Sequence, residues 1–482
     1  MFRSKTIIQP RAEQETSSVL VTLDIGDTYS GYAYTYTKDF MEDGWTIHMN
    51  DPWVREKHMT HKTCTSLLLE PDGKMTGAKY GYEAETEFAG KFMDGCSQEY
   101  ILFRNIKQEF YKDGVNFETE ITDVNTKVQK KPLCDITLAL LRFFREKAIE
   151  RIRKRFAAIT EDDIFWVLNV PSAWKQETSL LYRDLAIEAG ISYRRLQIVT
   201  EPEACLAYVM QYLRRRIPSK EKERISGIIS LFDARVMLLD LSGDAATLSV
   251  HRVSGDKTFK MVYQTRSHKK GSSQVNDQFL LFLSNLIGED IIRALEKDYV
   301  DDYMAMCDEF EMRKREIKPD TNDTDLFSFK LPYQIEETFK DLYKEEYRTI
   351  TQRIKEKSVF RDRVRYDRDR LHVEISVLKD LFDIVLNKIE VFIRNVLKMG
   401  PCARIVSFIL VGGFSESKLV QAGIKKRFPE MEVIVPETPE LAIMKGSLML
   451  AVQKETRPPT PPSGKFQRET EQTVISKICS VM

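Results

Sequence analysis

The chain has 482 residues, of which 42% are hydrophobic and 30% charged, so it is long enough to form two or more compact units. Its 73 basic and 73 acidic residues cancel, and this balance argues against a nucleic-acid-binding protein, which needs a net basic surface. Seven scattered cysteines without a CxxC pair favour neither a disulfide framework nor a zinc site. The N-terminus lacks an apolar signal segment and no apolar run reaches membrane-spanning length, which predicts a cytoplasmic protein without a transmembrane segment.

The first predicted elements are a strand, a tight turn and a second strand. Residues 1–17 are polar, and we expect them to be disordered. The segment VLVTLDIGDTYSGYAYTY (19–36) then alternates as paired strands do, with the turn around Gly26 to Thr28. Another strand with a glycine-containing turn is predicted near 65–75.

The middle of the first half predicts alternating helices and strands. A helix begins at Asp135 as its N-cap, and FWVLNVP (165–171) is typical of a buried strand. A helix over about 175–190 ends at Gly190. Residues 196–210 predict a short strand, a Glu-Pro turn and a helix, followed by a charged connector over 213–225.

The strand–turn–strand pattern then repeats. VMLLDLSGDAATLSVHRV (236–253) matches the pattern of 19–36, and the duplication indicates two related units. A long helix is predicted over about 374–399, stopped by Gly400 and Pro401, and SFILVGGFSES (407–417) predicts a strand, a glycine turn and a helix. Beyond Ala451 the proline-rich composition predicts a disordered tail.

Each glycine turn has two interpretations when it is considered alone. A strand followed by small residues can bring backbone N–H groups to a phosphate. The same pattern also makes a plain hairpin.

The ordered series of motifs is more specific than any single turn. It runs DIGDTYSG, NVPSAW, TEPEACLAYV, DLSGDAATLSV, FEMRKR, LVGGFSES and PELAIMKG. Over about residues 18–452 the series resembles the nucleotide-binding domain of the 70-kDa heat-shock family, within the actin-like ATPase superfamily. KYGYEAE, FEMRKREIKP and LVGGFSES resemble in particular its protein 12 branch. The resemblance implies an α/β, ribonuclease H-like duplicated fold of two lobes, with a central cleft for ATP or ADP and Mg²⁺.

The resemblance also implies roles for individual residues at the phosphate end. Asp24 and Asp240 would lie near Mg²⁺ and its waters, since carboxylate oxygens suit this ion. Glu201 would orient the attacking water, and Lys107 would reach the terminal phosphate, although the local match allows a shift of one residue. The turns would contact the nucleotide through Gly26, Asp27, Thr28, Tyr29, Ser242, Gly243 and Asp244.

At the adenosine end the resemblance implies a helix face and a glycine turn. Glu311, Lys314 and Arg315 share one helix face by their spacing and would clasp the adenosine. Gly412, Gly413 and Phe414 would form the turn under adenine and ribose, and Gly446 would lie in the helix that returns to the first lobe.

These residues also have interpretations without a ligand. Asp24 and Asp240 are typical of aspartates that begin turns. Glu311, Lys314 and Arg315 are compatible with a solvated helix face. Gly412 and Gly413 are compatible with a tight strand-to-helix turn.

The sequence departs from the family pattern at the phosphates. Asp27 stands where the family has Thr, Ser242-Gly243-Asp244-Ala245 replaces three glycines and a threonine, Thr247 replaces an aspartate, and Glu416 replaces a residue that is often basic. A carboxylate about 4 Å from a phosphate costs about 4 kcal/mol at an effective dielectric constant near 20. Unless a cation bridges Asp27 and Asp244, these carboxylates would largely abolish nucleotide binding. We therefore expect weak or lost hydrolysis, that is, at most a weak Mg-dependent ATPase. The alternative is a non-catalytic module, a pseudo-ATPase that binds an unknown protein partner and no nucleotide.

The resemblance divides the chain into two lobes and a tail. Lobe I would comprise 18–225 plus 437–452, lobe II 226–436, and the tail 453–482, which is too short for the peptide-binding module of the family. The last residues, Cys479-Ser480-Val481-Met482, fit a prenylation signal that would attach the chain to a membrane through Cys479, or they match it by chance.

Overall fold

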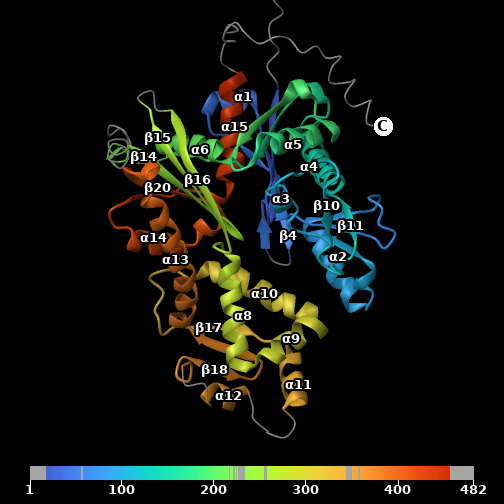
Figure 1. Ribbon diagram of the computed structural model, residues 1–482, viewed down its shortest axis with the longest axis vertical. Coiled ribbons are helices and arrows are strands. Elements are labelled where there is room, and N and C mark those ends of the chain that lie inside the picture. The colour runs from blue at the N-terminus through green and yellow to red at the C-terminus, as the bar shows by residue number, and fades with distance from the viewer. Residues whose placement is uncertain are drawn as a thin grey trace, which may run out of the picture.

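The computed structural model describes residues 18–55, 58–216, 218–220, 223, 225, 234–254, 258–343, 350–356 and 359–455. The predicted tails, including Cys479, lie outside these residues, and the predicted connector 213–225 is described only in part. The described residues form helices and several sheets, so the α/β class is confirmed (Figure 1).

The first sheet contains the hairpin predicted at 19–36. Its strand order is β13-β12-β1-β2-β3, and β6 also pairs with β2. The central strand β1 runs antiparallel to β2 and parallel to β12. The bounds are β1 (Val19–Ile25), β2 (Tyr29–Tyr36), β3 (His48–Met49), β6 (Thr63–Cys64), β12 (Ile164–Val170) and β13 (Leu196–Thr200).

The second sheet follows the same pattern. Its order is β16-β15-β14-β20-β21, and the central strand β14 runs antiparallel to β15 and parallel to β20. The bounds are β14 (Arg235–Leu241), β15 (Ala245–Val253), β16 (Phe259–His268), β20 (Ile405–Val411) and β21 (Glu432–Ile434). The repeated strand–turn–strand units of the sequence therefore form the centres of two sheets with equivalent topology.

Helices pack against the first sheet, and residues of both the helices and the strands form the hydrophobic core between them. The main helices are α4 (Leu133–Arg155), α5 (Gln176–Glu188) and α6 (Glu201–Arg215). The prediction that Asp135 caps α4 was wrong, because the helix begins at the fully buried Leu133 and leaves Asp135 in its first turn. An acidic residue there still suits the helix dipole.

The other helices and strands of the first part of the chain are α1 (Thr37–Asp43), β4 (Trp53–Arg55), β5 (His58–Thr60), β7 (Leu67–Leu69), β8 (Lys79–Tyr80), α2 (Gly81–Met93), β9 (Ile101–Phe103), α3 (Ile106–Glu109), β10 (Glu120–Thr122) and β11 (Lys130–Pro132).

The segment between β16 and α13 (Ile375–Leu397) forms a third region, at the lower end of the molecule in Figure 1. It contains the small sheet β17-β19-β18 and several helices. Their bounds are α8 (Ser273–Ile287), α9 (Glu289–Asp298), α10 (Val300–Arg313), β17 (Leu326–Lys330), α11 (Tyr333–Leu342), α12 (Ile350–Glu356), β18 (Val364–Asp367) and β19 (Arg370–Glu374). The long helix predicted at 374–399 is α13 (Ile375–Leu397), which joins this region to the second sheet, and α14 (Lys418–Arg427) follows β20.

The last described helix, α15 (Ala442–Glu455), returns to the first sheet and packs on α6. A side chain on Gly446 would overlap the backbone of Ala204, so the two helices touch through their main chains. One hydrophobic cluster joins this helix to both sheets, with Leu20, Val167, Leu238 and Ile409 among its members. No described helix is long and apolar enough to cross a membrane.

Candidate functional site

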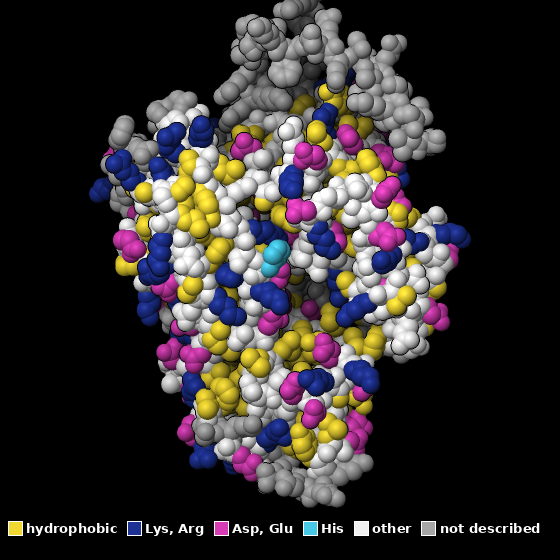
Figure 2. Space-filling model, viewed as in Figure 1, with side chains coloured by type: hydrophobic (Ala, Val, Ile, Leu, Met, Phe, Trp, Pro, Cys, Tyr) yellow, Lys and Arg dark blue, Asp and Glu magenta, His cyan; other side chains and the backbone are white. Residues whose placement is uncertain are grey.

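The residues predicted at the two glycine turns meet around a pocket of about 270 Å³. On the face shown in Figure 2, basic and acidic side chains surround a hollow where the parts of the molecule meet. The pocket is lined by 16 of the residues predicted for the site: Asp24, Gly26, Asp27, Thr28, Tyr29, Lys107, Glu201, Asp240, Ser242, Gly243, Asp244, Glu311, Arg315, Gly412, Gly413 and Phe414. Its volume lies near the lower end of the range of about 300–1,000 Å³ for small-molecule sites.

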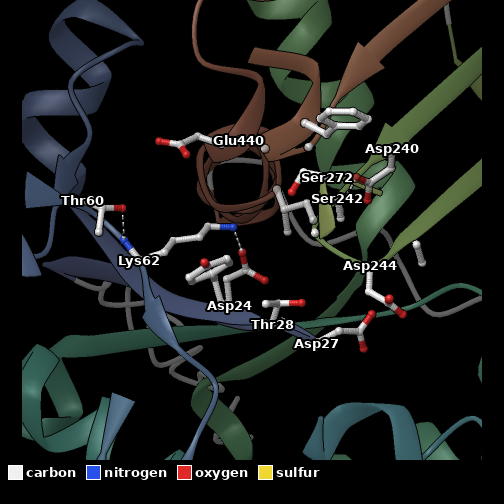
Figure 3. A pocket seen from close by; sticks show the side chains of 18 of the residues that line it. Asp24, Asp27, Thr28, Thr60, Lys62, Asp240, Ser242, Asp244, Ser272 and Glu440 are labelled. Atoms are coloured by element: carbon white, nitrogen blue, oxygen red, sulfur yellow. Dashed lines mark hydrogen bonds and ion pairs between the residues drawn. The ribbon is translucent and has the colours of Figure 1, made fainter. Parts of the chain in front are cut away.

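Two lysines, the buried Lys107 and the half-buried Lys62, neutralise carboxylates beside the first sheet. Lys62 Nζ lies 2.8 Å from Asp24 Oδ2, at the end of β1 (Figure 3). Lys107 Nζ, on α3, lies 2.7 Å from Glu201 Oε1, at the start of α6. Burial alone would lower the pKa of Lys107, but the carboxylates of Glu201, Asp24 and Asp27 outweigh it and raise the pKa above its usual value. Both lysines therefore remain cations at neutral pH.

Asp27 is neutralised by an arginine from the second sheet. Arg266, on β16, forms an ion pair with Asp27 Oδ2 and donates to the hydroxyl of Tyr111, whose ring lies 4.2 Å from the guanidinium. Burial alone would lower the pKa of Arg266, and Asp27 and Tyr111 outweigh it and raise the pKa. The electrostatic cost predicted for placing Asp27 beside a phosphate applies to an unpaired carboxylate. Because Arg266 pairs with Asp27, that cost is reduced.

The carboxylates of the second turn have weaker partners. Asp240, at the end of β14, accepts a hydrogen bond of 2.8 Å from the Ser242 hydroxyl. Burial and then the charge of Glu201 raise the pKa of Asp240 to about 6. Asp244 lies 3.5 Å from His268 Nδ1, and both side chains are partly open to solvent.

The predicted helix face over 311–315 is divided between the pocket and the interior. Glu311 pairs with Lys314 and, at 2.9 Å, with Arg315. Burial alone would raise the pKa of Glu311, but these two cations outweigh it and lower it. Lys314 is only 3% exposed, bonds the Ser272 carbonyl and Asn276, and is absent from the pocket lining within the described chain. Lys314 therefore fixes the helix from behind, whereas Glu311 and Arg315 face the pocket.

The glycine turn after β20 approaches the second hairpin closely. Gly412 has φ +86°, and a Cβ there would overlap Asp240 and lie 2.5 Å from the Leu241 carbonyl oxygen. At Gly413 a Cβ would have no neighbour within 4 Å among the described residues, so this residue exposes bare backbone in the pocket. Glu416, behind the turn, has its pKa raised to about 7 by burial and then by Glu440.

Sequence reasoning missed several residues of the pocket. Lys62 and Arg266 line it, and no motif or spacing pointed to them. Glu440 also lines it and belongs to the PELAIMKG motif, but it was not singled out as a site residue. The reverse holds for Gly446, which packs α15 on α6 and does not line the pocket.

Comparison with known proteins gives one consistent result. Heat shock 70 kDa protein 12A of Mus musculus is 25% identical over 497 aligned positions, covering 92% of this chain and 70% of the relative. Heat shock 70 kDa protein 12B of Homo sapiens is 26% identical over 492 aligned positions, which cover 91% of this chain and 69% of the relative. Over more than nine-tenths of its length the chain is therefore similar to heat shock 70 kDa proteins 12A and 12B. No protein-family model matches it.

The resemblance implies a bound nucleotide and Mg²⁺, and the side chains of the pocket suit these two ligands unequally. A nucleotide fits the bare backbone at Gly413. The buried Oδ1 of Asp27 has no donor among the described residues, and as an acceptor it suits a hydrogen-bond donor of a ligand rather than a phosphate oxygen. Mg²⁺ fits less well, because a lysine and a hydroxyl already bind the carboxylates of Asp24 and Asp240. No group of three or more His, Cys, Asp or Glu side chains in the described ranges could hold a metal ion.

Proposed function

We propose that the chain binds an adenine nucleotide, ATP or ADP, in this pocket and hydrolyses it weakly or not at all. The fold would be the actin-like one, with lobe I over 18–225 plus 437–452 and lobe II over 226–436. The packing of α15 on α6, which returns the last helix to the first sheet, supports this division. The observation that carries the proposal is the convergence of both hairpin turns, the Glu311 helix and the Gly412 turn on one pocket.

The two ends of the pocket suit the two ends of a nucleotide. Backbone at Gly413 allows a flat base or ribose to approach closely, and Arg315 can stack on a base or bind its acceptors. At the other end Lys62, Lys107 and Arg266 supply positive charge where the two turns meet. These three cations offset the repulsion between phosphate and the acidic turns, which supports binding in spite of Asp27.

The same ion pairs support weak hydrolysis. A residue that orients an attacking water must have a free acceptor oxygen within reach of the proton. One of the two Glu201 carboxylate oxygens, Oε1, is bound to Lys107 at 2.7 Å, which leaves Oε2 for a water, and Asp24 is bound to Lys62 at 2.8 Å. If the nucleotide drew Lys107 toward its terminal phosphate, Glu201 would be released and slow turnover would follow.

A second candidate function follows from the internal pairing of charges. Asp24, Asp27 and Glu201 each have a cation of this chain, so these three carboxylates are neutralised without any ligand. This observation favours a pseudo-ATPase module that binds no nucleotide and uses its lobes to hold a protein partner.

Calorimetric titration with ADP and ATP distinguishes the two candidates. We expect saturable micromolar binding, and we expect Gly413→Leu to weaken it at least tenfold, because the added side chain would fill the open space at that glycine. Gly400→Leu is the matched control, since its Cβ also meets nothing within 4 Å among described atoms but lies away from the pocket lining. Absence of binding at millimolar nucleotide would refute the proposal and favour the partner-binding module.

A further inference from the structure

The cation nearest to Asp24 is part of the chain. Lys62 lies between β5 and β6, and its Nζ is 2.8 Å from Asp24 Oδ2. The Asp24 side chain is 2% exposed and that of Lys62 17%. A buried carboxylate requires such a partner, because an unpaired charge is poorly tolerated away from water. Lys62 is therefore an internal counter-ion at the position where a bound cation would otherwise be needed.

The first sheet is shaped to admit this lysine. In the β1–β2 ladder Gly31 is the cross-strand partner of Asp24, so a side chain at Gly31 would lie beside the carboxylate. An added Cβ would lie 2.7 Å from the His61 carbonyl oxygen and 3.5 Å from Lys62 Cγ. The stem of Lys62 thus passes close to Gly31 of β2, where a side chain would crowd this segment.

The backbone of Lys62 is also fixed on both sides. The next residue, Thr63, pairs with Ser30 in the β2–β6 ladder, and its hydroxyl accepts the Tyr82 N–H at 2.8 Å. On the other side the Lys62 N–H donates to the Thr60 hydroxyl at 3.2 Å (Figure 3). A lysine held in this way is positioned like a site residue rather than like a surface side chain.

A divalent ion between Asp24 and Asp240 would meet this ammonium. Both carboxylates line the same pocket as Lys62, and a charge of the same sign beside Asp24 repels an incoming cation. The ammonium carries three N–H donors, and its bond to Asp24 uses one, so further donors remain for a phosphate oxygen. Lys62 can therefore bridge the carboxylate and the phosphate, which is the task that a metal ion performs in many nucleotide sites.

We propose that Lys62 replaces the divalent metal ion at Asp24, so that the pocket takes its nucleotide in the metal-free form. This inference rests on the proposed function, since it concerns how the same pocket binds the phosphates. It assigns a charge-bridging role to Lys62 and makes Gly31 the residue that permits it.

The test is titration of the full chain with ADP in buffer containing EDTA and, separately, in buffer containing Mg²⁺. For the unmodified protein we expect ADP binding in Mg²⁺ to be no tighter than in EDTA, because Mg²⁺ holds part of the ADP in a complex that the pocket does not take. For Lys62→Met we expect binding at least tenfold weaker in EDTA, with a partial return when Mg²⁺ is added, because Asp24 is then free for the ion. Lys74→Met, which removes an exposed lysine paired with the exposed Asp72, is the matched control and should leave both dissociation constants unchanged.

A second measurement needs no variant that might fail to fold. Electron paramagnetic resonance of Mn²⁺ reports free ion, and we expect that adding protein to a Mn²⁺–ADP mixture does not lower the signal, because the protein withdraws metal-free ADP and takes up no Mn²⁺. Loss of signal on adding protein would overturn the inference, as would unmodified protein that binds ADP tenfold or more tightly with Mg²⁺. ADP binding that occurs only with Mg²⁺ overturns this inference alone, whereas no binding in either buffer overturns the proposed function as well.

Discussion

The two hairpins at the pocket share one strand pattern but differ at a single cross-strand position. In the first hairpin Asp24 faces Gly31, and Lys62 passes close to that glycine to reach the carboxylate. In the second hairpin Asp240 faces Thr247, which occupies the equivalent position, and the Ser242 hydroxyl binds the carboxylate. The aspartate that faces a glycine thus has a cation as its partner, and the aspartate that faces a threonine has a hydroxyl.

The difference extends to the other carboxylate of each turn. Asp27 is paired with Arg266, whose side chain is 11% exposed, whereas Asp244 has the imidazole of His268, which is 51% exposed. The first turn is thus paired with permanent cations that are largely shielded from solvent, whereas the second has a hydroxyl and an imidazole near solvent as its partners. Three predictions test this contrast, in order of decreasing effect.

The largest effect is expected for Arg266→Met. Removing one partner of a buried ion pair leaves the other charge without compensation, which typically lowers the free energy of unfolding by about 3–5 kcal/mol. Urea unfolding followed by circular dichroism measures this loss. The double variant Asp27→Asn/Arg266→Met should recover most of it, and equal losses in the single and double variants would contradict the pairing.

A smaller, pH-dependent effect is expected for Asp240→Asn. The pKa of Asp240 is raised to about 6, so the folded state holds a proton that the unfolded state releases near pH 4. Through this group the free energy of unfolding falls as pH rises from about 4 to about 6, by at most about 3 kcal/mol. The free energy of unfolding of the Asn variant, relative to that of the unmodified protein, should therefore rise between about pH 4 and pH 6 and stay higher above pH 6.

The measurement is the midpoint of thermal unfolding at several pH values between 4 and 8. Asp162→Asn, at an exposed position, serves as the control and should follow the unmodified protein. A constant difference between Asp240→Asn and the unmodified protein at all pH values would show that Asp240 is not protonated in the folded state.

The smallest effect distinguishes the two cross-strand positions themselves. Gly31→Ala brings a Cβ within 2.7 Å of the His61 carbonyl oxygen, and overpacking of this kind typically costs about 1–3 kcal/mol. Thr247→Ala removes atoms from the equivalent position and is expected to cost less than about 1 kcal/mol. The denaturant midpoints of the Gly31→Ala and Thr247→Ala variants measure these two losses of stability. Equal losses would mean that the Lys62 side chain does not need a glycine at position 31.

Local patterns predicted the centre of the fold well. The segments 19–36 and 236–253 have alternating side chains around a turn, and both form the expected hairpins. The start of α4 could not be predicted as well, because the burial of Leu133 outweighs the capping preference of Asp135. Capping is a local preference, whereas burial depends on contacts that only the folded chain has.

For the site, the sequence predicted which residues meet but not how their charges are balanced. Gly413 and Glu311 line the same pocket although about a hundred residues separate them along the chain. Arg266 reaches Asp27 from the other sheet, and nothing in its own strand marks it as the partner. Ion pairs between distant elements carry no sequence spacing, so the neutralisation of Asp27 could be seen only in three dimensions.

The packing of α15 has a consequence for the order of events during synthesis. Its residues Met444 and Leu448 complete a hydrophobic cluster that includes Leu20 of the first strand, and Gly446 lets the helix touch α6. About two hundred residues that form the second sheet and the lower region emerge from the ribosome between α6 and α15. Until then the nascent first sheet exposes an apolar face, so this chain needs either rapid later synthesis or a transient cover from another molecule to avoid aggregation.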